Sequence, residues 1–308
     1  MILLNTKNQP IESYSILIKN FILLGILLSF SFSERLDMGA INNSKINEAS
    51  GIASSKINPE LIWVHNDSGD MARVYAIGLD GSYLGVLRLP GIIARDWEDM
   101  SLGPGPEDDT DYIYIGDIGD NFSKKNKKRI YRFKEPKLYI DSLSIPFNIK
   151  INNVDKITFT YPENKSDSET LMIDPLTRDI HIITKRESSP YIYTLPYPQS
   201  TSETIVADFT GNLTISPKQP YLMSDMIVAG DISRDGSMIL IKTYYQIILI
   251  NRDPELPFSS IIKEEQTALD YIIEPQGEST CWSWDQSGYF TISEQSNDAP
   301  VHLYYYLK

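Results

Sequence analysis

Acidic residues recur at intervals along the chain, each near the start of a predicted strand. Five segments share one form: a small or acidic residue, a spacer, an apolar residue and then polar residues before a second strand. Their first residues are 48, 71, 61 and 48 positions apart and are Ser50, Glu98, Glu169, Gly230 and Glu278. Oxygen ligands without His or Cys favour calcium over zinc or a redox metal. The pattern predicts a calcium site at these five positions, provided that the fold brings them together.

Three carboxylates gathered in a narrow space repel one another, so they need either a cation or protons. The alternative is that each acid accepts hydrogen bonds from backbone amides of a neighbouring strand, in which case the recurring acids have a structural role only.

A second set of polar residues stands at or near the ends of the following strands and is a candidate for catalysis. It comprises His65, Asn66, Asp67, Asp117 and Lys185, with Arg95 shortly before Glu98. Such groups beside a metal can bind a phosphate ester and direct water at it.

In that interpretation Asp67 or Asp117 activates the water. Arg95 and Lys185 hold the phosphate, and His65 and Asn66 contact the substrate. Simpler roles stay open: the Asp67 turn can cap its own backbone, Lys185 can neutralise the recurring acids, and His65 can pack at a strand end.

The elements that must position these residues also repeat. Each recurring segment is followed by a strongly apolar strand and then by a third, such as 61–66 and 73–79 in the first unit, and four of the five units have a fourth. About four strands per unit at spacings near 50 residues predict a five-bladed β-propeller with four-stranded blades. We expect residues 35–42 to supply the missing strand of the last blade and thereby remove its open edge. A sixth, degenerate blade within a long loop, such as 135–153, is the alternative.

The order Ser, Glu, Glu, small residue, Glu, one per unit, resembles the calcium-activated nucleotidases (apyrases) of the five-bladed type. The stretch WVHNDSGDMARVYAI (63–77) is similar to the first-blade segment of that family. The resemblance implies a calcium ion on the propeller axis and hydrolysis of nucleotides. Gly230 replaces a family Ser, so the fourth ligand would be a backbone carbonyl or a water, or would be absent. Ser68-Gly69-Asp70 stands where the family has a basic residue. The chain also resembles a wider group of secreted propellers with the phrases HNDSGD, RDWEDM and GDIGDN.

Composition limits the partners. The formal net charge is −13, with 41 acidic and 28 basic residues, and such a surface repels nucleic acid. The expected partner is a small phosphorylated molecule or an extracellular protein or glycan. The basic run 124–129 is either a solvated loop or a patch that recruits anions.

The amino end predicts secretion. Residues 21–32 (FILLGILLSFSF) fit a signal-peptide core, so we expect residues 1–33 to be a signal peptide or a signal anchor, and 34–308 to be one propeller domain. Contact with a membrane is expected only if this leader is not cleaved. Five Asn-x-Ser/Thr sequons would permit glycosylation of a secreted chain. The single Cys281 cannot form a disulfide within the chain.

Two functions follow from these features. The first is a secreted, calcium-dependent phosphoester hydrolase, and the second is a non-catalytic propeller with structural calcium that binds a protein or a glycan. A calcium-dependent lactonase of the six-bladed type fits less well, because five units are counted. Motifs of serine esterases, zincins and P-loop kinases are absent from the sequence.

Overall fold

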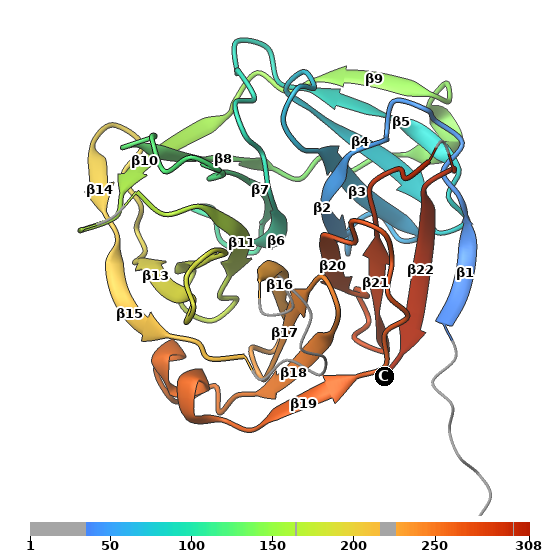
Figure 1. Cartoon of the computed structure of the whole chain (residues 1–308). Coiled ribbons are helices and arrows are strands. Elements are labelled where there is room, and N and C mark those ends of the chain that lie inside the picture. The colour runs from blue at the N-terminus through green and yellow to red at the C-terminus, as the bar shows by residue number, and fades with distance from the viewer. Residues whose placement is uncertain (1–34, 164, 216–225, 298) are drawn as a thin grey trace, which may run out of the picture. The chain divides into compact units, whose positions relative to one another are not determined.

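The computed structural model describes residues 35–163, 165–215, 226–297 and 299–308. The predicted leader lies outside these residues, as does the sequon at Asn164. Residues Arg35–Lys308 form one compact unit, and every strand of five small sheets lies within it. The sheets are arranged in a ring (Figure 1), which confirms the five-bladed β-propeller.

Each blade has four antiparallel strands, which follow one another from the axis outward. The first three blades are β2 (Ala49–Ser54), β3 (Leu61–Asn66), β4 (Arg73–Gly78), β5 (Tyr83–Arg88); β6 (Met100–Pro104), β7 (Asp111–Asp117), β8 (Lys128–Lys134), β10 (Asp155–Thr160); and β11 (Ser168–Ile173), β12 (Ile180–Thr184), β13 (Tyr191–Leu195), β15 (Asp208–Asn212). The other two are β16 (Ile227–Ile232), β17 (Met238–Thr243), β18 (Ile247–Asn251), β19 (Gln266–Leu269); and β20 (Ser279–Trp282), β21 (Gly288–Ile292), β22 (His302–Leu307), β1 (Arg35–Ala40).

The amino-terminal strand closes the ring, as predicted. β1 pairs antiparallel with β22, with Arg35 opposite Tyr306 and Ala40 opposite His302. The fifth blade is therefore built from both ends of the domain, and β22 keeps no open edge.

Two short strands reach across to a neighbouring blade. β9 (Phe147–Lys150) pairs parallel with β5 of the first blade, although it lies between two strands of the second. β14 (Thr204–Val206) pairs parallel with β10 in the same manner. Gly85 permits the close approach of β9, because a Cβ there would lie 2.4 Å from Cγ of Phe147. The stretch 135–153 is thus not a simple loop but includes β9 and the 3-10 helix η1 (Ile140–Ser142). A second 3-10 helix, η2 (Phe258–Lys263), lies between β18 and β19.

The strands form because their alternating side chains are apolar on both faces, and each face packs against the next blade. Between the first and second blades, Trp63, Trp97, Tyr131, Phe133 and Phe147 belong to one buried cluster. Buried β-branched and aromatic residues favour the extended backbone. The blades are consequently rigid, which fixes the positions of the residues at their inner ends.

The inner strands also bond directly to one another. The carboxylate of Asp99 accepts the amide of Leu171 in the third blade at 2.9 Å. Asp231 accepts the amide of Trp282 in the fifth blade at 2.9 Å. Asp99 and Asp231 thus accept the backbone amides of a neighbouring inner strand, which is the structural role considered for the recurring acids. Asp99 is the residue after Glu98.

We call the face on which the inner strands begin the upper face. Because neighbouring strands are antiparallel, the second strand of each blade ends on this face and the third begins there. The loops after Asn66, Asp117 and Thr184 therefore all lie on the upper face. So does the connection 89–99 between the outer strand of the first blade and the inner strand of the second.

Candidate metal centre

The recurring acids lie at the upper end of the innermost strand of their blades. In three blades the pairing of the two innermost strands has a β-bulge at this position. The pairing of the two innermost strands shifts between Ala49 and Gly51, between Ser168 and Thr170, and between Ile227 and Ala229. The extra residues are Ser50, Glu169 and Val228. A bulge turns one side chain out of the regular alternation, here at the upper end of the inner strand.

The same register corrects the fourth position. The last pairs before the hairpin turns are Ile173 with Ile180, Ile232 with Ile239 and Trp282 with Tyr289. Four residues before the inner member of each pair stand Glu169, Val228 and Glu278. Gly230 therefore lies two residues beyond the ring position, and Val228 occupies it. Among the described residues, the fourth blade offers no side-chain ligand at the ring position.

The Oγ of Ser50 donates a hydrogen bond to the backbone carbonyl of Glu98, which leaves its lone pairs able to bind an ion. Among the predicted ligands, Ser50 and the three glutamates therefore remain.

Lys185 neutralises two of the three glutamates. This is the simpler of the two roles that the sequence left open for it. Its Nζ donates hydrogen bonds to Glu169 and to the hydroxyl of Tyr244, the latter at 2.8 Å, and lies 3.8 Å from Glu278. Tyr244 in turn donates to Glu278. Burial alone would lower the pKa of Lys185, but Glu169 and Glu278 raise it above its usual value. The lysine is therefore charged at neutral pH.

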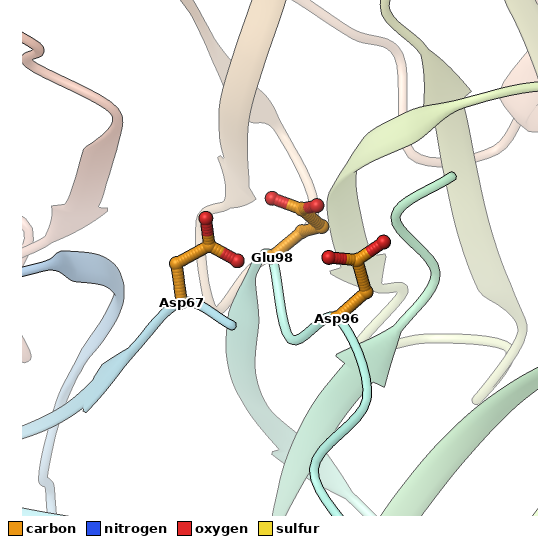
Figure 2. Close-up of side chains that lie close together, drawn as sticks. All are labelled: Asp67, Asp96 and Glu98. Carbon is orange, nitrogen blue, oxygen red and sulfur yellow. The ribbon is translucent and has the colours of Figure 1, made fainter. Parts of the chain in front are cut away.

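Glu98 has no such partner. Its side chain joins two groups of carboxylates, and in each group the nearest oxygens lie within 4.8 Å of one another. The groups are Asp67, Asp96 and Glu98 (Figure 2), and Glu98, Asp167 and Glu169. We call these five residues the acid cluster.

Glu98 is only 3% exposed, and no hydrogen bond or ion pair reaches its carboxylate from the residues that the structure describes. Burial, followed by the charges of Glu169 and Asp67, holds the pKa of Glu98 well above its usual range. An ionised Glu98 thus requires a cation beside it.

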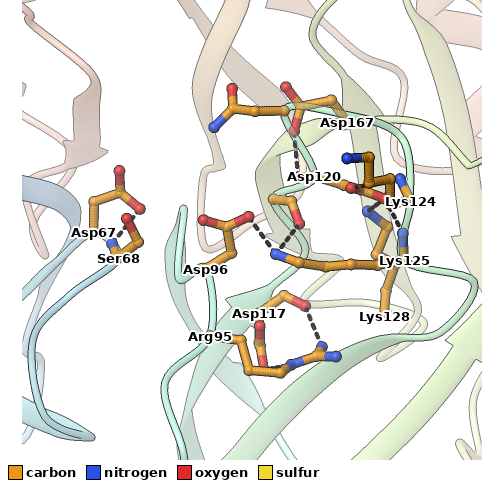
Figure 3. A network of polar contacts seen from close by, with 12 residues as sticks. Asp67, Ser68, Arg95, Asp96, Asp117, Asp120, Lys124, Lys125, Lys128 and Asp167 are labelled. Atoms are coloured by element: carbon orange, nitrogen blue, oxygen red, sulfur yellow. Dashed lines mark hydrogen bonds and ion pairs between the residues drawn. The ribbon is translucent and has the colours of Figure 1, made fainter.

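Basic side chains fix two members of the acid cluster. Lys125 forms an ion pair with Asp96 (Figure 3), and Nε of Arg186 lies 2.5 Å from Asp167. The other oxygen of Asp167 accepts the amide of Asp120 at 2.6 Å. These contacts leave each carboxylate held in place from outside the acid cluster.

Asp67 stands at the edge of the acid cluster and has no basic partner among the described residues. Its carboxylate accepts the amide of Ser68, which is the turn contact expected of this residue. Burial, with the negative charges of Glu278, Asp96 and Glu48, raises the pKa of Asp67 to about 6. It can take up or release a proton near neutral pH.

The remaining predicted catalytic residues are engaged elsewhere. Asp117 is fully buried and accepts Nε of Arg95 at 2.8 Å (Figure 3), so the predicted base and the predicted phosphate ligand are paired with each other. Lys185 likewise contacts Glu169. None of the three residues forms a direct contact with Asp67.

His65 and Asn66 are structural. His65 is fully buried with its ring edge against Trp97, and burial lowers its pKa to about 4, so it is neutral. Asn66 donates hydrogen bonds to Asp70 at 3.1 Å and to the carbonyl of Lys45 at 2.6 Å. His65 therefore has the packed role that the sequence left open.

Asp96 and Asp167 enlarge the set predicted from sequence. Each lies two residues before a ring glutamate, Glu98 or Glu169, and that repeated spacing is the signal by which sequence analysis could have selected them.

The comparisons with known proteins add no family. No protein-family model matches the chain, and no curated protein matches it either. Among the described residues, no helix has the length and apolar character needed to cross a bilayer. The structure shows the fold alone.

Proposed function

We propose that this protein is a secreted, calcium-binding β-propeller whose ion lies in the acid cluster at the upper mouth of the central channel. The observation that carries the proposal is Glu98, a buried carboxylate without a partner, between two groups of acids. Hard carboxylate oxygens suit calcium, which accepts six to eight oxygen ligands in variable geometry, and waters complete such a shell.

The charge of the acid cluster supports a divalent ion. Its five carboxylates are accompanied by three basic partners, Lys125, Lys185 and Arg186. Lys185 is shared with Glu278, so six carboxylates meet three basic partners, and three negative charges remain when all are ionised; a divalent cation offsets two of them. Because Lys185 already neutralises Glu169 and Glu278, we place the ion beside the carboxylates of the first and second blades and away from the central axis.

Isothermal titration calorimetry tests the proposal on residues 34–308, which contain every strand of the ring. We expect one calcium ion per chain. Glu98→Gln removes the shared ligand and should abolish binding. Glu278→Gln is the matched control, because Glu278 is already held by Lys185 and Tyr244, and it should retain binding. Absence of heat in the unmodified protein, or equal loss in both variants, would contradict the site.

Secretion is tested separately. We expect residues 1–33 to direct the chain into the secretory pathway and to be removed, so amino-terminal sequencing of protein from the medium should begin near Glu34. Retention of the chain in cell membranes would instead identify the leader as an anchor.

A calcium-dependent phosphoester hydrolase is the second candidate, and Asp67 favours it. Asp67 lies at the edge of the acid cluster without a basic partner among the described residues, and in this role its ionised carboxylate accepts a proton from a water held by the ion. Phosphate release from a panel of nucleotides, with and without calcium, tests this role. Loss of release in Asp67→Asn with calcium binding retained would support it. Calcium binding without turnover would identify a non-catalytic propeller for a protein or glycan.

A further inference from the structure

The two most exposed large hydrophobic side chains among the described residues both lie on the upper face. Among the exposed large hydrophobic residues described, Phe122 is the most exposed at 78%, followed by Ile93 at 72%. Both belong to upper-face loops, and so does Met71, at 56%. Single exposed hydrophobic residues are common on soluble proteins, so their common location and their neighbours carry the inference.

The loops flank the acid cluster on two sides. Met71 and Ile93 line one groove of about 440 Å³ on the side of the first blade. Asn121, next to Phe122, accepts a hydrogen bond from Arg186 of the third blade. The same loop sends Lys125 to Asp96 within the acid cluster. Apolar tips therefore stand on both sides of the candidate ion site.

Basic side chains accompany each apolar tip. Lys124 lies over the Phe122 ring, with Nζ 5.1 Å from its centroid. Lys127, in the same loop, is exposed. Arg88 and Lys150 line the groove of Met71 and Ile93. Apolar tips flanked by lysine and arginine match the chemistry of an anionic lipid surface, where the ring enters the interface and the cations meet the headgroups.

The acid cluster between them decides whether such contact is possible. Without a cation its carboxylates repel anionic headgroups, and a bound divalent ion offsets two of these negative charges. Within a Debye length of about 10 Å the nearest charges dominate the interaction. Ion binding would thus make the centre of the upper face less repulsive, beside loops that carry apolar and basic side chains, although Glu278, Glu294 and Glu48 stay near it.

We infer that the upper face binds anionic lipid membranes in a calcium-dependent manner, through the loops that carry Met71, Ile93 and Phe122. This inference depends on the proposed calcium site. It assigns to Lys124 and Lys127, the exposed lysines of the basic run 124–129, the role of recruiting anions, and it adds a membrane contact that needs no uncleaved leader.

Vesicle co-sedimentation tests the inference with residues 34–308. The vesicles are phosphatidylcholine alone, or phosphatidylcholine with phosphatidylserine, each in calcium or in a calcium chelator. We expect binding only to the phosphatidylserine vesicles and only in calcium. Phe122→Ser should reduce the partition coefficient about tenfold or more, because a buried aromatic ring is lost from the interface.

Tyr139→Ser is the matched control. Tyr139 is 68% exposed and also has a lysine over its ring, with Nζ of Lys137 5.8 Å from the centroid. It belongs to the connection that leaves β8 at the opposite face, so its loss should not affect vesicle binding.

Calorimetry on the same preparation separates the two proposals. Calcium binding without vesicle binding would overturn the membrane assignment alone and leave the upper face to a protein partner. Vesicle binding that persists in chelator, or equal losses in Phe122→Ser and Tyr139→Ser, would also overturn it. Absence of calcium binding would overturn both this inference and the proposed function.

Discussion

At the scale of single residues, Glu98 is an unfavourable group in the ion-free protein. Its carboxylate is buried beside four others, and no hydrogen bond or ion pair from the described residues reaches it. We predict that Glu98→Gln raises the thermal unfolding midpoint in chelator, by on the order of 1–2 kcal/mol of unfolding free energy, since a neutral amide of similar shape replaces an unpaired charge.

Glu278→Gln should have the opposite effect in the same thermal experiment, because it weakens the contacts of Lys185 and Tyr244. A lower midpoint for Glu98→Gln in chelator would mean that the glutamate already has a stabilising partner.

The pH dependence of the ion-free protein follows from several raised carboxyl pKa values. The pKa of Asp67 is about 6, burial with the charge of Glu278 raises the pKa of Glu294 to about 7, and burial raises that of Asp231 to about 7. These exceed the usual values near 4 in an unfolded chain, so the native state retains protons that the unfolded state releases. The buried His65 and His181, with lowered pKa values, act in the opposite direction, but the raised carboxyls outnumber them, so we predict that stability falls as pH rises from about 4 to about 7.

Thermal unfolding in calcium-free buffers across this range measures the slope, and Asp67→Asn should make it shallower. Calcium competes with the same protons, so calcium affinity should rise with pH over the upper part of the range. Stability that increases with pH in calcium-free buffer would contradict the raised pKa values.

At the scale of elements, closure by β1 depends on one glycine. Gly39 has φ +134° at an irregularity in the pairing with β22, and a Cβ there would lie 2.3 Å from the backbone oxygen of Asp80. We predict that Gly39→Ala destabilises the protein by about 2 kcal/mol or more, because strain and a backbone clash act together.

Gly91→Ala is the control for this prediction. Gly91 also has a positive φ, +80°, but nothing lies within 4 Å of its added Cβ. It should cost about 1 kcal/mol, the conformational contribution alone. Equal losses of stability in urea unfolding would show that the β1 contact contributes little.

The strands could be predicted because runs of apolar residues recur in every blade. The bulges could not be predicted from such runs. In the fourth blade, alignment on small and apolar residues selects Gly230, but the pairing shift between Ile227 and Ala229 brings Val228 to the ring. A bulge adds one residue without changing composition. The position of Lys185 between two acids likewise depends on side-chain direction, so sequence analysis could only leave its role open.

The parallel strands β9 and β14 show the same limit. Each pairs with a blade other than that of its neighbours in sequence, and this choice is decided by packing such as that of Phe147 over Gly85. Sequence analysis assigned the first of them to a loop and the second to the outer strand of the third blade.

At the scale of the whole molecule, the acid cluster connects three blades. Asp67 comes from the first, Asp96 and Glu98 from the second, and Asp167 and Glu169 from the third. Lys185 and Tyr244 continue the contacts to Glu278 of the fifth. An ion in the acid cluster would therefore link residues of several blades around the upper mouth of the channel. Unfolding of any of these blades would release the ion.

Calcium should accordingly stabilise the entire ring rather than one loop. At a free concentration one hundred times the dissociation constant, binding to the native state alone contributes about 2.7 kcal/mol. For a domain of this size that raises the unfolding midpoint by about 5–10 °C. Differential scanning calorimetry of residues 34–308 should show one transition that shifts as a unit. Glu98→Gln should abolish the shift, and Phe122→Ser, which leaves every proposed ligand intact, should retain it. A shift confined to part of a divided transition would mean that the ion stabilises single blades and that the ring does not unfold as one unit.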